Sequence, residues 1–371
     1  MSEPTLEDAL IMAPSYGRRF SGINATMEAV IPTMAAELPI ACCGRHLSDA
    51  LPKTSLWRWL RSPNRAHPRV WHARRNNDML VGIFLKSMLR QNLKLLFTSA
   101  AQRHHTTLTR WCYQRMDAVV ATTSKAASYL RCDSVISHHG IDCDTYHPPY
   151  DREAMKASLG IQCRPTLAVF GRVRPQKGTC DFVKALLAVL PRFDEWQVLF
   201  VGATTRRYVA YQRKLEQDLE SANLHDRVLF KGFVREFSDM QRWYQSADVI
   251  GCVSRNEGFG LTCLEGMASG APVLATKAGA WDDIITDGVD GWIAEASDPT
   301  DLARALYDAL ATPAKQRSQM GRKARETVLR SYQVQSEADR LASVYCQLLG
   351  CSREQLAHNH VDAGQVLRKA A

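Results

Sequence analysis

The sequence predicts an α/β protein with two parallel-sheet lobes. Short apolar runs alternate with amphipathic segments from end to end, which is typical of parallel strands covered by helices. The chain has 371 residues, and at roughly 100 to 200 residues for each domain this length predicts two domains. Hydrophobic residues make up 46% and charged residues 23%, a globular composition that excludes long disorder and a fibrous structure.

Six apolar runs with the length of strands define the first lobe. Helical patterns are expected between them, for example over 77–90, 110–116 and 125–131. The strands are predicted at Leu10–Ala13, Pro39–Cys43, Val70–Ala73, Leu93–Thr98, Ala118–Thr122 and Ser134–Ser137.

A second series of strands and helices follows the segment 147–150, whose consecutive prolines stop both helix and sheet and indicate a linker. Strands are predicted at Thr166–Phe170, Gln197–Val201, Arg227–Lys231, Asp248–Val253 and Pro272–Ala275. Helices are predicted at Asp181–Leu190, Tyr208–Ala222, Ser238–Ser246, Leu261–Ser269, Thr300–Ala311 and Ser336–Leu349. We therefore expect lobes over 1–148 and 149–335, and a C-terminal helix and tail over 336–371 that packs back on the N-terminal lobe.

The cysteines and the apolar stretches exclude several classes of protein. Eleven cysteines occur with no C-x-x-C spacing, so neither a disulfide framework nor a zinc site is expected. The stretch 80–97 is interrupted by three cations and is too polar for a membrane span. The first residues are acidic where a secretion signal would be basic, so a cytoplasmic location is expected.

Positive charge is concentrated in the first lobe. Residues 1–150 hold 18 Lys/Arg against 11 Asp/Glu, a surplus of +7 out of the +9 of the whole chain. The segment 56–75 mixes Trp57, Trp59 and Trp71 with six arginines, which favours an anionic acceptor or lipid headgroups. A solvated basic surface with core tryptophans explains the segment equally well. Nucleic acid is not an expected partner, because no compact recognition motif accompanies the charge.

One strand-to-helix turn is rich in cations. The sequence Phe170-Gly-Arg-Val-Arg-Pro-Gln-Lys-Gly178 leaves a predicted strand and enters a helix. Cations at a helix N-terminus are unfavourable for the helix dipole unless an anion lies between them. A diphosphate is such an anion, with Arg172 binding its oxygens bidentately, Lys177 acting as a point charge, and Gly171 allowing close approach of the backbone. The alternative is a basic surface loop.

A second turn carries two carboxylates. Glu257 lies in the loop after a predicted strand, and Glu265 lies eight positions further on, about two turns inside the next helix. Gly258 and Gly260 leave the first amides of that helix accessible. A carboxylate beside a phosphate is costly, so both glutamates are expected to accept hydrogen bonds from sugar or ribose hydroxyls. The alternative is a solvated helix face, which does not explain Glu265 inside an apolar run.

These turns resemble motifs of the retaining GT-B glycosyltransferases, the glycosyl transferases group 1. The spacing from Glu257 to Glu265 resembles the family's E-x7-E signature, and Gly171 to Gly178 resembles its diphosphate loop. His-Gly-Ile-Asp at 139–142 and Asp-Gly-Val-Asp-Gly-Trp at 287–292 are similar to two further motifs in the same order. The general pattern looks closest to bacterial lipopolysaccharide-core mannosyltransferases. The resemblance implies two Rossmann-like lobes with the active site in the cleft between them.

The resemblance also implies roles for particular residues. Arg172 and Lys177 would hold the donor diphosphate, Glu265 the ribose and Glu257 the transferred sugar. Backbone amides of Phe259, Gly260 and Leu261, together with Gly171, would contact phosphate or sugar. Relatives have a glycine pair near the N-terminus, for which Gly22 is the candidate here, and a histidine after the fourth strand, for which His104 and His105 are candidates.

The function that we expect is therefore transfer of a hexose with retention of configuration. Mannose from GDP-mannose is the expected donor group, and a lipopolysaccharide-core or other lipid-linked glycan is the expected acceptor at the inner face of the cytoplasmic membrane. No metal and no cofactor beyond the nucleotide sugar is implied. The alternatives are a UDP-sugar donor, a non-catalytic binder of nucleotides or anionic polymers, and a nicotinamide oxidoreductase, although no G-x-G-x-x-G follows the first strand.

Overall fold

The structure is a computed structural model and describes residues 6–17, 22–62, 67–234 and 237–357. It divides into two compact units, one formed by residues 1–140 with 334–371 and the other by 141–333. The first boundary precedes the predicted one at 148, because the Ile141 amide donates to the Tyr332 carbonyl at 2.8 Å and Tyr146 is buried in the second unit's core. The expected tail beyond residue 357 lies outside the described residues.

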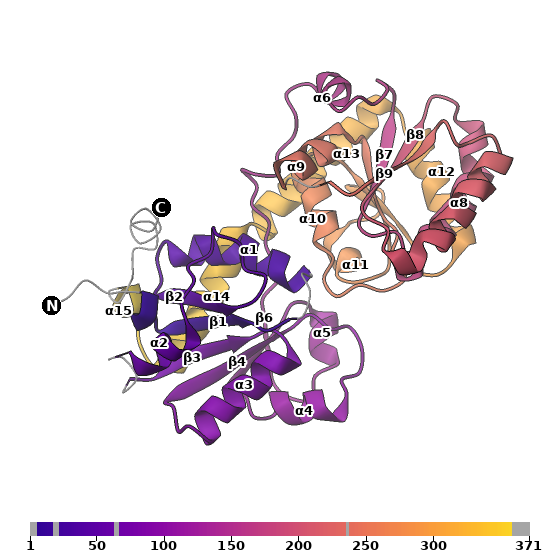
Figure 1. The fold of residues 1–371 in the computed structure, drawn as a ribbon. Coiled ribbons are helices and arrows are strands. Elements are labelled where there is room, and N and C mark those ends of the chain that lie inside the picture. Colours follow the sequence, from indigo (N-terminus) through magenta and orange to yellow (C-terminus); the bar gives the residue numbers. More distant parts are fainter. Residues whose placement is uncertain (1–5, 18–21, 63–66, 235–236, 358–371) are drawn as a thin grey trace. The chain divides into compact units, whose positions relative to one another are not determined.

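The first lobe contains a six-stranded parallel sheet in the order β2-β1-β3-β4-β5-β6 (Figure 1). Its strands are β1 (Ile11–Ser15), β2 (Ile40–Gly44), β3 (Arg69–Ala73), β4 (Leu93–Ser99), β5 (Ala118–Ala121) and β6 (Val135–Ile136). The central strands β1 and β3 are buried over their whole length, which requires helices on both faces of the sheet.

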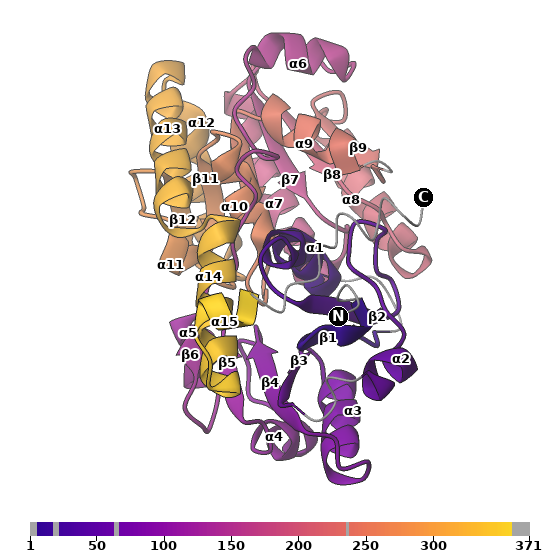
Figure 2. The same ribbon diagram turned by 90° about the vertical axis from the view of Figure 1, so that its left-hand side faces the viewer.

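Two layers of helices cover that sheet (Figures 1 and 2). One layer contains α1 (Gly22–Ala35), α14 (Val334–Leu349) and α15 (Arg353–Ala357), so the C-terminal segment packs on the first lobe. The other layer contains α2 (Leu56–Arg61), α3 (Asn76–Ser87), α4 (Thr107–Tyr113) and α5 (Ser124–Ser128). Apolar side chains of β1, β3 and β4 alternate between the two layers, as the two-residue period of a strand requires.

The second lobe has the same architecture, with six parallel strands in the order β12-β11-β10-β7-β8-β9. The strands are β7 (Thr166–Phe170), β8 (Gln197–Val201), β9 (Val228–Gly232), β10 (Val249–Cys252), β11 (Val273–Thr276) and β12 (Gly291–Ala294). The helices are α6 (Arg152–Ser158), α7 (Thr179–Val189), α8 (Val209–Ser221), α9 (Phe237–Ser246), α10 (Leu261–Ala268), α11 (Trp281–Ile284), α12 (Pro299–Ala311) and α13 (Ala314–Ser331).

Four elements of this lobe were missing from the sequence prediction: the short helices α6 and α11, the strand β12 and the helix α13. β12 follows a turn closed by the Gly288 amide on the Gly291 carbonyl at 2.8 Å, and its four residues are too few for a clear alternation. The helix α13 is very polar, because its buried stripe contains small and cationic residues such as Gly321, Ala324 and Arg317. A periodicity of large apolar residues therefore does not reveal it.

The Trp/Arg segment 56–75 is mostly interior. Trp59 and Trp71 are fully buried, and the Arg69 guanidinium lies 4.0 Å above the Trp59 ring and donates to its carbonyl. Trp57, which is 65% exposed, and the exposed Arg58 and Arg61 fit the predicted surface role, while Arg65 lies outside the described residues. The structure fits the alternative of a basic surface with core tryptophans better, because α2 and β3 bury Trp59 and Trp71.

The stretch 80–97 consists of two elements, as the predicted helix and strand indicate. Its first half is the end of α3 and its second half is β4, a central strand of the sheet. No helix in the described ranges is long and apolar enough to cross a membrane.

Candidate active site

Two strand-to-helix turns of the second lobe meet at the carboxyl edge of its sheet. They follow β7 and β10, which are parallel neighbours. The turns touch, because the Arg255 amide donates to the Gln176 carbonyl at 3.0 Å. A Cβ on Gly178, whose φ is +66°, would lie 1.7 Å from the Val253 carbonyl oxygen. Only glycine fits where these two turns cross, and the crossing brings the two predicted motifs together.

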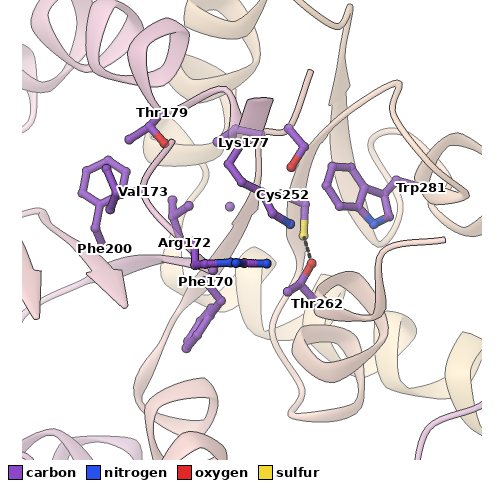
Figure 3. A pocket seen from close by; sticks show the side chains of 14 residues that line it. Phe170, Arg172, Val173, Lys177, Thr179, Phe200, Cys252, Thr262 and Trp281 are labelled. Atoms are coloured by element: carbon purple, nitrogen blue, oxygen red, sulfur yellow. Dashed lines mark hydrogen bonds between the residues drawn. The ribbon is translucent and has the colours of Figure 1, made fainter. Parts of the chain in front are cut away.

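A pocket lies between the turns, lined by residues of β7, β8, β10 and α10 and by Trp281 (Figure 3). Arg172 and Lys177 direct their nitrogen atoms toward the same space. The Cys252 thiol and the Thr262 hydroxyl, 3.7 Å apart, form part of its wall. The pocket is therefore cationic on one side and has a helix N-terminus on the other, which suits an anionic group.

Lys177 is paired with Glu257. Its ammonium donates to the Glu257 carboxylate, which also accepts from the Ser254 hydroxyl at 3.1 Å. The two charged side chains are 22% and 18% exposed, so the pair is largely shielded from water. The sequence predicted both residues for the site but assigned Glu257 to hydroxyl groups alone. The pairing shows that the carboxylate also compensates the charge of the lysine.

Arg172 has no such compensation. It is exposed, and within the described part of the chain its guanidinium makes no hydrogen bond or ion pair. Gly171, with φ of +118°, turns the chain so that Arg172 and Lys177 lie on the same side of the pocket (Figure 3). A bidentate donor with free nitrogen atoms beside a pocket is well suited to a phosphate.

Glu265 lies on α10 and is held by two tyrosines. The hydroxyls of Tyr244 and Tyr146 both donate to its carboxylate, the second at 3.4 Å. Tyr244 is itself fixed by stacking on Phe170, with ring centroids 3.7 Å apart. Burial raises the pKa of Glu265, while the two tyrosine hydrogen bonds and the charge of Lys177 counteract that rise. Two tyrosine donors leave acceptor positions on the carboxylate for further hydroxyl groups.

The backbone just before α10 packs tightly against the Trp281 side chain. Gly260 precedes the helix with φ of +89°, and a Cβ on it would lie 2.3 Å from the Trp281 indole nitrogen. That nitrogen donates to the Gly260 carbonyl at 2.8 Å. Phe259 is buried and its carbonyl accepts from the Ala280 amide at 3.0 Å, and Leu261 begins the helix. Contact of the amides of Phe259, Gly260 and Leu261 with phosphate or sugar stays a prediction.

The first-lobe candidates find less support. Gly22 begins α1 and is exposed, and a Cβ there would meet nothing within 4 Å, so no close packing demands glycine. His104 is exposed and lies edge-on to Tyr129, with ring centroids 5.2 Å apart. His105 is half-buried against Tyr113, and burial together with Arg103 lowers its pKa. All three stay predictions for donor or acceptor contacts.

Sequence reasoning missed a polar cluster at the carboxyl edge of the first sheet. The Arg75 guanidinium donates to Asn24 at 2.7 Å and to the Ser15 hydroxyl at 3.2 Å. A Cβ on Gly17 would lie 2.6 Å from the Arg75 Cζ atom, so the loop after β1 rests on this arginine. The doubled arginine at 74–75 directly after a predicted strand was the available signal.

The chain contains one D-x-D triplet, at 142–144, but its first carboxylate is used locally. Asp142 accepts from the Asp144 amide at 2.9 Å and from the Thr145 hydroxyl at 2.6 Å, which closes a turn. Across the described ranges, no group of three or more His, Cys, Asp or Glu side chains could hold a metal ion.

Two six-stranded parallel sheets, each covered by helices, define a protein of the GT-B class. Residues 151–327 match the family model described as Glycosyl transferases group 1. A lipopolysaccharide core biosynthesis mannosyltransferase, LpcC of Rhizobium leguminosarum bv. viciae, is 42% identical over 94% of this chain and 99% of its own length. A second such mannosyltransferase, LpsB of Rhizobium meliloti, is 36% identical over 93% of this chain and 99% of its own.

The chain belongs to the glycosyl transferases group 1 family and is a glycosyltransferase. HepE of Anabaena, solved in complex with UDP and glucose, is similar in fold, with a TM-score of 0.76 over 91% of this chain and 99% of that one. Because HepE and this chain are only 17% identical, the similarity to HepE concerns the fold alone.

Proposed function

We propose that the protein transfers mannose from GDP-mannose to a lipopolysaccharide-core acceptor, with retention of configuration and without a metal ion. One observation carries the proposal. Two relatives named as lipopolysaccharide core biosynthesis mannosyltransferases are 42% and 36% identical to nearly the full length of the chain. Similarity over both lobes matters, because the donor and the acceptor are expected to contact different lobes.

The pocket of the second lobe supplies the groups that this reaction needs. Cleavage of the sugar–phosphate bond leaves negative charge on the departing diphosphate, and Arg172 and Lys177 are placed to stabilise it. Lys177 then exchanges its bond to Glu257 for one to phosphate, and the released carboxylate accepts hydrogen bonds from the transferred sugar. Glu265, oriented by its two tyrosines, accepts from the ribose.

The acceptor is a lipid-linked glycan, and the protein works as a peripheral protein at the inner face of the cytoplasmic membrane. The charge of its first lobe supports this location, because residues 1–150 contain 18 Lys/Arg and 11 Asp/Glu, a surplus of seven positive charges. Such a surplus attracts the protein to a surface of anionic lipids, at about 1 kcal/mol for each cation near that surface.

The test is a donor screen with purified protein. GDP-mannose, GDP-fucose, UDP-glucose and UDP-galactose are offered with and without a truncated lipopolysaccharide core, and the products are read by mass spectrometry. We expect a mass increase of one hexose with GDP-mannose only. A matched control is the Lys177→Met variant, which removes the ammonium but keeps most of the side-chain volume. Transfer from a UDP-sugar alone, or no transfer from any donor, would refute the mannosyl assignment.

A further inference from the structure

The outer surface of the α2–α4 layer is unusually apolar for a surface that faces water. The inner sides of these helices pack on the first lobe's sheet, and large apolar side chains on their outer sides are exposed in the described structure. Among the described residues, seven of the fifteen exposed large apolar side chains lie on this layer or at its helix ends. They are Trp57, Leu80, Phe84, Met88, Leu89, Leu108 and Trp111.

Helix α3 contributes a continuous stripe. Leu80, Phe84 and Met88 are spaced by four residues, so they follow one another along the same side of the helix. Their exposed fractions rise from 37% to 52% and 70% toward the C-terminal end. That side is opposite to Met79 and Leu85, which are buried against the sheet. The helix is therefore apolar on both its inner and its outer side.

Helix α4 continues the surface. It packs beside α3, and the Asn76 side chain of α3 donates to the Thr109 hydroxyl of α4 at 2.9 Å (Figures 1 and 2). Leu108 and Trp111 are exposed on its outer side. The Arg115 guanidinium lies 4.0 Å above the Trp111 ring and donates to its carbonyl at 2.9 Å. Two adjacent helices thus present aromatic, aliphatic and cationic groups together.

The charge of this region has one sign. Residues 74–116 contain eight Lys/Arg and a single carboxylate, that of Asp78, which is fully buried. One of these cations, Lys86, is paired with Asp117 at 2.7 Å. Arg90, at the end of α3, and Arg115, after α4, are exposed, and Arg110 is half-buried between them in sequence. The apolar stripe is consequently bordered by cations that have no acidic neighbours in this segment.

From this combination we infer that the α3–α4 surface, formed by the outer sides of these two helices, docks on an anionic lipid bilayer. Apolar side chains enter the acyl boundary, Trp111 lies at the headgroup level, and arginines bind lipid phosphates. Among the described residues of the second lobe, each exposed large apolar side chain lies on a different element or loop, so these side chains form no comparable surface. A protein partner would need acidic groups opposite these arginines, whereas a bilayer of anionic lipids supplies them everywhere. The inference rests on the proposed membrane location and identifies the surface that produces it.

The experiment measures co-sedimentation of the full-length protein with vesicles, without donor or acceptor. Vesicles of phosphatidylglycerol mixed with phosphatidylcholine are compared with pure phosphatidylcholine across a salt series. We expect binding to the anionic vesicles only, released by salt because the Debye length shortens from about 10 Å at 0.1 M.

Two sets of variants locate the binding surface, each with a matched control on the second lobe. The apolar set is Phe84→Ser, Met88→Ser and Trp111→Ser, and its control is Tyr150→Ser, Val209→Ser and Leu329→Ser. The cationic set is Arg90→Gln, Arg110→Gln and Arg115→Gln, and its control is Lys315→Gln, Arg322→Gln and Arg330→Gln on α13. We expect each surface set to lower the partition coefficient at least ten-fold, since one cation contributes about five-fold. Both controls should stay within two-fold of the wild type.

The outcomes separate this inference from the proposed function. Unchanged circular dichroism and unchanged donor hydrolysis show that the surface variants are folded. If the donor screen fails but the vesicle results are as expected, the mannosyl assignment is wrong and the docking surface stands. The docking surface is refuted if the wild-type protein does not bind anionic vesicles, or if the surface variants bind them as tightly as the control variants do. A protein partner for the surface is then favoured.

Discussion

The Lys177–Glu257 pair can be tested by a double-mutant cycle on nucleotide binding. Lys177→Met removes the ammonium and leaves the Glu257 carboxylate with only the Ser254 hydroxyl at 3.1 Å. An incoming diphosphate then loses one cation and meets an uncompensated negative charge. Glu257→Gln has the opposite effect, because Lys177 no longer has to leave a carboxylate before it binds phosphate. We therefore expect Glu257→Gln to strengthen binding of the free nucleotide.

The size of the coupling follows from how far the pair is shielded. Exposed ion pairs contribute about 0 to 1 kcal/mol, and removal of one partner from a buried pair costs about 3 to 5 kcal/mol. The two side chains are 22% and 18% exposed, which is intermediate. We expect a coupling of about 2 kcal/mol, equal to about 30-fold in affinity. Glu257→Gln should thus strengthen nucleotide binding about 30-fold more in the wild type, where Lys177 must leave the carboxylate, than in Lys177→Met, where no ion pair is broken.

Calorimetric titration of the four proteins with GDP, with UDP in parallel, measures the coupling at one fixed salt concentration. Lys184→Met is the matched control, because Lys184 is an exposed lysine on α7, the helix that follows the same turn. The control should bind GDP like the wild type. Effects of the two substitutions that add to within about 0.5 kcal/mol would show that the residues act independently, and the reasoning would fail.

Three further predictions concern the same pocket. Arg172→Ala should lower turnover about 100-fold or more without changing the melting temperature, since the side chain is exposed and acts on the leaving diphosphate; unchanged turnover in the folded variant contradicts this role. Glu265→Ala should weaken GDP binding, measured by calorimetry, whereas Glu257→Ala should not, because ribose belongs to donor and product alike while Glu257 contacts only the transferred sugar; equal effects count against this division. Tyr244→Phe should raise the pKa of Glu265 further, because a hydrogen bond that counteracts the rise due to burial is lost. A carboxyl whose folded-state pKa is raised loses stability as pH increases from its ordinary pKa to the raised one, so the drop in melting temperature of this variant should be larger at pH 8 than at pH 5. An equal drop at both pH values would show that the hydroxyl does not stabilise the charged form.

Much of the second lobe's site could be predicted because it consists of short local motifs. A turn that leaves a parallel strand and enters a helix must lie at the carboxyl edge of the sheet, whatever surrounds it. Arg172, Lys177 and the N-terminus of α10 therefore lie at the predicted edge, and the pocket forms between their turns. Spacing within one turn and one helix is sufficient for such a prediction.

The partners of these residues could not be predicted in the same way. Lys177 and Glu257 are 80 residues apart, and the Tyr146 hydroxyl meets Glu265 from 119 residues away. Residues so far apart in sequence leave no periodic pattern that would reveal their contact. These contacts depend on the strand order β10-β7-β8 and on the linker, whose Tyr146 packs into the core of the second lobe. The first lobe is a similar case, since the Trp/Arg mixture of 56–75 contains core and surface residues that composition does not separate.

The sequence by itself determined the α/β class, the two lobes and the two turns that carry cations and carboxylates, because each depends on periodicity and on residue type over a few positions. The tertiary structure alone decided that Glu257 neutralises Lys177, that two tyrosines orient Glu265, and that the exposed apolar surface lies on α3 and α4 rather than on the tryptophan-rich segment. The physical reason is that burial and pairing are properties of side chains brought together by sheet order, and local sequence does not specify which distant segment completes a contact.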